Sequence, residues 1–149
     1  MNPKKPRKKC KNCGIECKRP QAIYCSNNCQ FIYQRKKYIE KWKNGEINGT
    51  GSGGDISGHI RKYLFEKYNN MCQKCGWNKK NPHSHKIPLT IHHIDGNYYN
   101  SKEDNLELLC PNCHSLTENY GVYNSGNGRK NRPTARKKYH TKNNSPVIQ

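Results

Sequence analysis

Two kinds of reactive side chain are interleaved in the middle of this chain. The first kind is a set of four cysteines, in two pairs that each have two residues between the partners: Cys72, Cys75, Cys110 and Cys113. Each pair can point two sulfurs at one ion, and two pairs complete the tetrahedral site that Zn²⁺ prefers. Because four cysteines leave no open position for a substrate, the spacing predicts a structural zinc.

The second kind is a set of polar side chains that a purely structural zinc module would not need. It consists of His92, His93, Asn105 and His114. Imidazole groups bind divalent cations and exchange protons near neutral pH. The pattern therefore indicates a site in which the histidines do chemistry while the cysteines fasten the fold.

A further cysteine set lies near the N-terminus: Cys10, Cys13, Cys25 and Cys29. The same ligand logic predicts a second structural zinc, held by a zinc finger. Cys17 is left over, either as a free thiol or as a competitor for Cys13 in the site. The finger faces DNA on one interpretation, and on the other it only stabilises the fold or contacts protein.

Composition narrows the class of partner. The 149 residues carry 28 Lys and Arg against 10 Asp and Glu, a net charge of +18, and only 31% are hydrophobic. A chain this small and polar needs metals or partners to supplement its core. The charge favours a protein that binds a polyanion, of which nucleic acid is the commonest, over a ribosome-like or membrane-surface basic protein.

No apolar run is long enough to span a membrane, and no signal peptide is visible. We therefore expect reduced cysteines and a cytoplasmic location.

The chain divides by composition into four parts. These are a basic arm, zinc finger and helix over 1–45, a Gly-rich flexible linker over 46–56, a metal-braced domain over 57–120 and a basic flexible tail over 121–149. The first helix carries apolar residues at helical spacing and is expected to end at Asn44-Gly45.

The local patterns of the 57–120 part predict helices and a hairpin. A helix begins at Ser57, carries Ile60, Leu64 and Tyr68 as one apolar stripe, and ends at Asn69-Asn70. Residues 87–94 alternate like a strand, residues 95–104 form a polar loop, residues 106–109 form a short second strand and residues 113–120 form a helix. Alternation puts His92 and His93 on opposite faces, but a strand end can relax this. Strand, loop, strand and helix can then gather His93, Asn105 and His114 around one pocket, with the four-cysteine zinc on its far side.

Residues 72–118 resemble the HNH endonucleases, in the subset whose ββα-metal motif is braced by a four-cysteine zinc. The matching segments are His92-His93-Ile94, Asn105-Leu106 and Cys113-His114, and the run from Ser57 to Leu64 also looks like small HNH proteins of phages and bacteria. The resemblance covers 57–120. It implies a small α+β, treble-clef-like nuclease domain beside an N-terminal zinc finger with a basic helix.

The resemblance also assigns roles. His93 matches the general base that takes a proton from water, His92 and His114 match ligands of a catalytic divalent cation such as Mg²⁺, and Asn105 matches the residue that orients the base. The implied reaction is hydrolysis of a DNA phosphodiester bond. Some roles stay open. His93 could be the ligand and His92 a surface residue; Asn105 alone could be a turn residue.

Two acidic residues near the motif also have open roles. Glu118, one helical turn beyond His114 in the predicted helix, is either a third ligand or a solvated acid. Asp95 either bonds locally in the turn or lies near the metal.

Double-stranded DNA is the expected partner, bound by a monomer or weak dimer and not at a membrane. The predicted contacts are basic residues of the first helix, the second helix and the tail: Arg35, Lys36, Lys37, Arg61, Arg129, Lys130 and Arg132. Arg61 could equally lie on a solvated helix face. The resemblance favours a phage or mobile-element enzyme of the homing type. The alternatives are a non-catalytic zinc-finger DNA-binding regulator and an RNA-binding basic protein.

Overall fold

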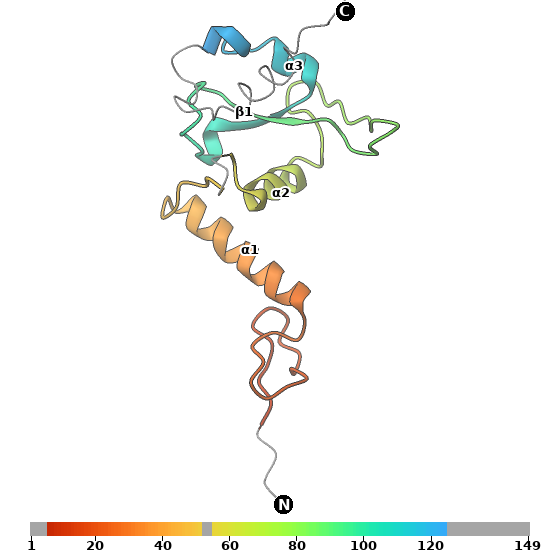
Figure 1. Cartoon of the computed structure of the whole chain (residues 1–149), viewed down its shortest axis with the longest axis vertical. Coiled ribbons are helices and arrows are strands. Elements are labelled where there is room, and N and C mark those ends of the chain that lie inside the picture. The colour runs from red at the N-terminus through yellow and green to blue at the C-terminus, as the bar shows by residue number, and fades with distance from the viewer. Residues whose placement is uncertain (1–5, 52–54, 125–149) are drawn as a thin grey trace, which may run out of the picture.

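The computed structural model describes residues 6–51 and 55–124 of this small α+β protein (Figure 1). Its elements, in chain order, are α1 (Asn27–Lys43), α2 (Gly58–Lys67), β1 (Thr90–His93), a 3₁₀ turn (Glu103–Asn105), β2 (Leu106–Leu109), α3 (Pro111–Ser115) and a second 3₁₀ turn (Gly121–Asn124). No helix in the described ranges is both long and apolar enough to cross a membrane. The predicted contacts Arg129, Lys130 and Arg132, and most of the predicted tail, lie outside the described residues.

Helix α1 carries the N-terminal cysteine module at one end and the core of the protein at the other (Figure 1). Ser26 caps its start, because the hydroxyl accepts a hydrogen bond from the backbone N–H of Cys29 at 3.2 Å. It ends at Asn44, followed by Gly45 at φ 74°, as predicted. Only Trp42 of this helix is buried, whereas Phe31 is 46% exposed. The apolar residues of α1 therefore anchor only the C-terminal end of the helix to the core.

Helix α2 supplies the buried centre of the fold. The Ser57 hydroxyl accepts a hydrogen bond from the N–H of Ile60 at 3.3 Å, and Ile60 and Leu64 are fully buried. The helix is followed by Asn69 and Asn70 in the left-handed conformation, at φ 50° and 54°. The predicted start, apolar stripe and stop of this helix are confirmed.

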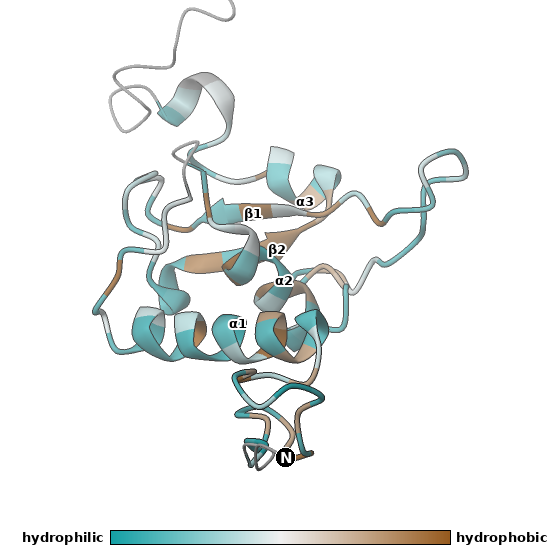
Figure 2. Ribbon diagram, turned by 60° about the horizontal axis from the view of Figure 1, so that its bottom comes forward, coloured by the Kyte–Doolittle hydropathy of each residue, from teal (hydrophilic) through white to brown (hydrophobic). Residues whose placement is uncertain are grey.

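The two strands form an antiparallel hairpin whose register pairs His92 with Glu107 and His93 with Leu106. The predicted strand over 87–94 is confirmed for its second half, Thr90–His93. Leu106, Leu108 and Leu109 of β2 pack against α2 in one hydrophobic cluster. Figure 2 shows hydrophobic residues in the strands and in parts of α1 and α2.

Helix α3 differs from the helix predicted over 113–120. It begins at Pro111, which tolerates a first-turn position because it lacks an N–H group, and it ends at Ser115. It stops there because the N–H and hydroxyl groups of Thr117 both bond to the carbonyl oxygen of His114, at 3.2 and 2.8 Å. Glu118 is therefore not one helical turn beyond His114; it is exposed and lies outside the helix.

The described part of the predicted flexible linker is packed rather than free. Gly49 is buried at φ 78°, and its carbonyl oxygen accepts a hydrogen bond from the N–H of Ser57 at 2.9 Å. A Cβ at this position would lie 2.5 Å from Cδ1 of Ile60 and 2.9 Å from Nε1 of Trp42. That indole N–H donates to the carbonyl oxygen of Ser101 at 2.7 Å. Composition predicted flexibility at 46–56, but tertiary packing uses Gly49 for close approach instead.

We predict that Gly49→Ala lowers the unfolding free energy by about 2 kcal/mol or more, because it adds a steric overlap to backbone strain. Gly45→Ala is the matched control. Gly45 has a similar φ of 74°, but nothing lies within 4 Å of the position that its Cβ would take. The control should therefore lose only the unfolding free energy that backbone strain costs. Thermal or urea unfolding of both variants measures the difference, and equal losses would contradict the packed role of Gly49.

Candidate active site and metal centres

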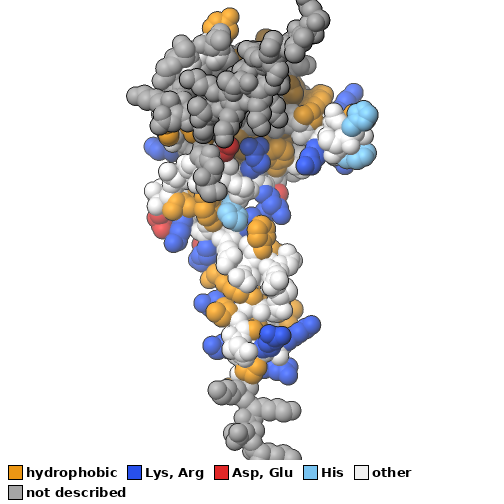
Figure 3. All heavy atoms as spheres, viewed as in Figure 1, with side chains coloured by type: hydrophobic (Ala, Val, Ile, Leu, Met, Phe, Trp, Pro, Cys, Tyr) orange, Lys and Arg blue, Asp and Glu red, His pale blue; other side chains and the backbone are white. Residues whose placement is uncertain are grey.

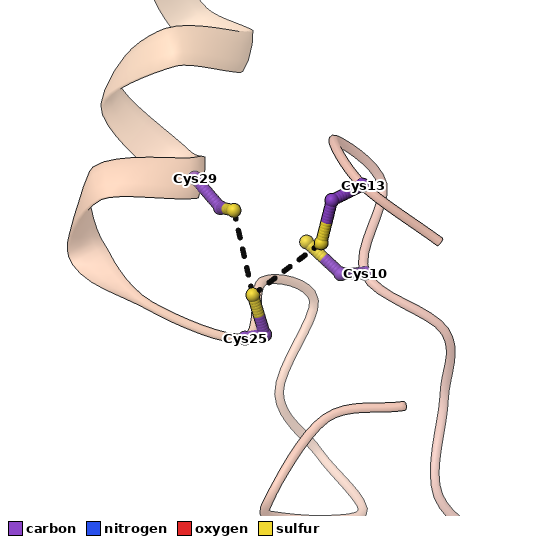
Figure 4. A group of neighbouring side chains, drawn as sticks. All are labelled: Cys10, Cys13, Cys25 and Cys29. Carbon is purple, nitrogen blue, oxygen red and sulfur yellow. Dashed lines mark hydrogen bonds between the residues drawn. The ribbon is translucent and has the colours of Figure 1, made fainter. Parts of the chain in front are cut away.

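Two groups of four cysteines each bring their sulfur atoms within 4.8 Å of one another, and they are the two predicted sets. In the N-terminal group, Sγ of Cys25 lies 3.5 Å from that of Cys13 and 3.4 Å from that of Cys29. Figure 4 shows these side chains converging from a loop and from the start of α1. In the second group, the sulfurs of Cys75 and Cys110 lie 3.7 Å apart. Both arrangements fit a tetrahedral metal ion.

Both groups are built by the same local devices. The first pair of each closes a tight turn in which a following glycine, Gly14 or Gly76, donates its N–H to the carbonyl oxygen of the first cysteine. These glycines have φ values of 75° and 71°, which a side chain would strain. The second pair of each group lies at a helix start, where Cys29 and Cys113 fall in the first turn. Hydrogen bonding to the Asn12 side chain lowers the pKa of Cys29, whereas side-chain hydrogen bonds with Cys75 and Cys110 raise that of Cys113 to about 12.

The acidity of the first cysteine of each group fits metal binding. Burial alone raises the pKa of Cys72, but hydrogen bonds from the backbone N–H groups of Cys110 and Cys75 outweigh it and bring the pKa to about 6. Cys10 has the same balance of causes and a pKa of about 6. Each group thus contains a cysteine that is deprotonated at neutral pH, as metal binding requires.

Cys17 lies outside both groups. It is fully buried, and its backbone N–H donates to the carbonyl oxygen of Lys8 at 2.8 Å. Burial raises the pKa of its thiol, so it stays protonated. Of the two alternatives from the sequence, the geometry supports a free thiol over a competitor for Cys13.

The three histidines of the second set lie together along a cleft of about 580 Å³. The rings of His92 and His114 have centroids 5.3 Å apart at an angle of 67°, so β1 and α3 bring the two imidazoles side by side. His92 is only 8% exposed, which does not fit the alternative of a surface histidine. Arg61 of α2 also lines this cleft, which favours a role at the site over a purely solvated face.

The environment of the cleft keeps these imidazoles neutral. Burial, reinforced by the neighbouring His114, lowers the pKa of His92 to about 4. Burial also lowers the pKa values of His93 and His114. Nε2 of His93 is buried and has no hydrogen-bond partner among the described residues. A neutral imidazole with a free nitrogen can accept a proton, and two adjacent neutral imidazoles can bind a cation.

Asn105 does not line the cleft; it holds the turn that follows β1. Its side-chain N–H₂ donates to Oδ1 of Asp95 at 2.8 Å, and its Oδ1 accepts from the N–H of Asp95 at 3.0 Å. Its backbone oxygen accepts from the N–H of Ile94. These bonds fix the backbone next to His93 but go to the turn rather than to the imidazole. Of the two roles considered for Asp95, these bonds support local hydrogen bonding within the turn.

Two residues at the site were not singled out from the sequence. Glu107 lies opposite His92 in the hairpin, with 3.9 Å between Oε1 and Nε2, and also lies 3.8 Å from the ammonium group of Lys74. The side-chain amide of Asn119 donates to the carbonyl oxygens of His93 and Ile94 at 3.3 and 3.2 Å. The strand register alone would identify Glu107, but no sequence signal marks Asn119.

The predicted DNA contacts on α1 have different surroundings. Arg35 forms a 2.9 Å ion pair with Glu66, and Lys37 forms one of 2.8 Å with Glu40. Lys36 is exposed and makes no ion pair with any described residue. Two of the three predicted contacts on this helix are thus partly neutralised within the protein.

Comparison with known proteins identifies the central region. Residues 72–119 match the family model described as HNH endonuclease. The chain is 48% identical over 122 residues to the H-N-H endonuclease F-TflIV of Escherichia phage T5, an alignment that covers 71% of this chain and 51% of that protein. It is 32% identical over 95 residues to the Zorya protein ZorE of Escherichia coli, over 64% of this chain and 19% of that protein. The chain thus spans about half the length of the first relative and about a fifth of the second. No solved structure matches it significantly.

We predict that Cys13→Ala removes one of two tightly bound metal ions per chain, because it deletes a ligand from the N-terminal group. Cys17→Ala, the matched control, keeps both ions because Cys17 lies outside the groups. Elemental analysis of the purified variants measures the metal content. Loss of metal from the Cys17 variant, or its retention in the Cys13 variant, would contradict the ligand set.

Proposed function

Because residues 72–119 form an HNH endonuclease domain, we propose that this chain is a metal-dependent endonuclease that hydrolyses DNA phosphodiester bonds. The observation that carries the proposal is the cleft in which His92, His93 and His114 lie together, all with lowered pKa values. Groups that are neutral at pH 7 suit both cation binding and proton abstraction.

His93 is the proposed general base. Its Nε2, which has no hydrogen-bond partner among the described residues, accepts a proton from the attacking water. The bonds of Asn105 and Asn119 to the adjacent backbone fix the chain that carries the ring. His92 and His114 are the proposed ligands of Mg²⁺ or another divalent cation. Within the described residues, only the two cysteine groups gather three or more ligand atoms, so such a cation keeps open positions for water and phosphate. When bound, it neutralises charge on the phosphate and the leaving oxygen.

The finer features of the proposal follow the same chemistry. Zn²⁺ is the proposed metal of both cysteine groups, since four thiolates are a typical structural zinc site. The nuclease domain is proposed to be treble-clef-like, with β1, β2 and α3 as its ββα-metal motif. The substrate is proposed to be double-stranded DNA, cut by a monomer or weak dimer in the cytoplasm of a bacterial or phage-infected cell. The phage relative supports a phage or mobile-element origin, with a homing role as the most specific form.

We predict that His93→Ala lowers the rate of plasmid cleavage with Mg²⁺ or Mn²⁺ by about 10²- to 10⁴-fold, because it removes the general base. DNA binding and metal content should remain, and added imidazole should restore part of the rate. Glu118→Gln is the control, since Glu118 is exposed outside the cleft and its loss should leave cleavage unchanged. Equal cleavage by wild type and His93→Ala would instead support a non-catalytic DNA-binding regulator, and a preference for RNA an RNA-binding protein.

The pH dependence of cleavage gives an independent test. Only neutral His93 can accept a proton, and burial lowers its pKa from the ordinary 6.5. The acid limb of the rate should therefore have its midpoint below about pH 6.5. Since the charge of Asp95 raises the pKa of His93, Asp95→Asn should move the midpoint lower still. Single-turnover rates at saturating Mg²⁺ measure both; a midpoint above 6.5 would contradict the assignment.

A further inference from the structure

A loop of residues 78–86, between the first cysteine pair of the nuclease domain and β1, projects from the body of the protein (Figure 1). We call it the basic loop. All nine of its residues are exposed. In the space-filling view, lysine and histidine side chains gather on this projection (Figure 3). None of these residues is among the predicted DNA contacts, and the proposed mechanism does not use them.

The basic loop carries positive charge that nothing nearby neutralises. It contains Lys79, Lys80 and Lys86, and the sequence has no acidic residue between Glu66 and Asp95. None of the ion pairs among the described residues involves these three lysines. Four lysines on α1 and α2, by contrast, form ion pairs with glutamates: Lys37, Lys43, Lys62 and Lys67. Three uncompensated ammonium groups on one short projection are a site for an anion with several charges.

The loop is also ordered by its own hydrogen bonds. Oδ1 of Asn81 accepts from the N–H groups of His83 and Ser84, both at 2.9 Å. The N–H of Asn81 donates to the carbonyl oxygen of Lys86 at 2.8 Å, and the N–H of His85 donates to that of Asn81 at 2.9 Å. These bonds close a turn that holds Lys80 and Lys86 at its base. The lysines are thus presented on a formed scaffold, which reduces the entropy lost on binding.

The position of the loop places it beside the proposed cleavage site. Lys86 precedes His92 by six residues, and a fully extended chain spans at most about 3.3–3.6 Å per residue. The two residues are therefore no more than about 20 Å apart. One strand of duplex DNA rises about 3.4 Å per nucleotide, so this distance corresponds to about six base pairs. A duplex held in the cleft lies within reach of the loop.

We propose that the basic loop binds the phosphate backbone of the DNA duplex on one side of the cleavage site. Lys79, Lys80 and Lys86 make the contacts and fix the position of the substrate without reading its sequence. The proposal deepens the proposed function, on which it rests for DNA as the ligand. The first test measures binding alone, so it remains informative even for a chain that does not cleave.

The first test compares Lys79→Gln/Lys80→Gln/Lys86→Gln with the charge-preserving Lys79→Arg/Lys80→Arg/Lys86→Arg variant. Binding to a duplex of about 30 base pairs is followed by fluorescence anisotropy at several salt concentrations, without added divalent cation. Each lost phosphate contact should lower the slope of log K against log[salt] by about 0.9. We expect a decrease of about 2–3 in the glutamine variant and none in the arginine variant. An unchanged slope in the glutamine variant would overturn the proposal.

The second test distinguishes the effect of the lysine charges from the effect of the loop conformation. Asn81→Ala keeps every charge but removes the acceptor that closes the turn, so we expect several-fold weaker binding with an unchanged salt slope. Hydroxyl-radical footprinting of the glutamine variant should lose protection on one side only, within about six base pairs of the cleavage site. Protection lost evenly across the footprint would overturn the proposed position. Tighter binding to RNA, lost in the same variant, would overturn DNA as the ligand.

Discussion

The convergence of Cys72, Cys75, Cys110 and Cys113 is the constraint on which the rest of the domain that carries the histidine cleft depends. The hairpin has strands of four residues and α3 has five, lengths at which neither element is stable alone. A metal on these cysteines would join the start of α3 to the turn after α2. Gln73 adds two hydrogen bonds to Leu108 of β2, at 2.9 and 2.6 Å. Because His114 directly follows Cys113, this convergence also sets the position of a cleft histidine.

The protein has a net charge of +18, yet the histidines of its cleft are neutral. A strongly basic surface suits the proposed DNA partner, whereas protonated imidazoles would repel the divalent cation of the proposed mechanism. Burial keeps the histidines neutral within this basic protein, because the packing that covers β1 and β2 makes protonation of His92 and His93 unfavourable. The repulsion from Lys74 acts on His92 in the same direction. A neutral site inside a cationic protein is thus a consequence of the hairpin's position, between α2 and α3.

The features that could be predicted from the sequence are those that neighbouring residues decide. The cap at Ser57, the stop at Asn69-Asn70 and the cysteine spacing are local signals, and the structure contains each of them. The features that were missed depend on tertiary packing or on a side-chain bond that the apolar pattern does not mark. The composition around Gly49 could not show that Trp42 and Ile60 pack against it, and the end of α3 depends on a Thr117 bond that competes with helix continuation.

The same packing determines what the N-terminal cysteine module can do. Trp42 is held between Gly49, Tyr63 and the carbonyl oxygen of Ser101, so the C-terminal end of α1 is fixed on the core. A helix of 17 residues is about 25 Å long. The module at its other end therefore lies about one helix length, about 25 Å, from the end of α1 that is fixed on the core. A freely tethered module would sample many positions relative to the core, whereas this one is carried on a helix whose far end is packed into it.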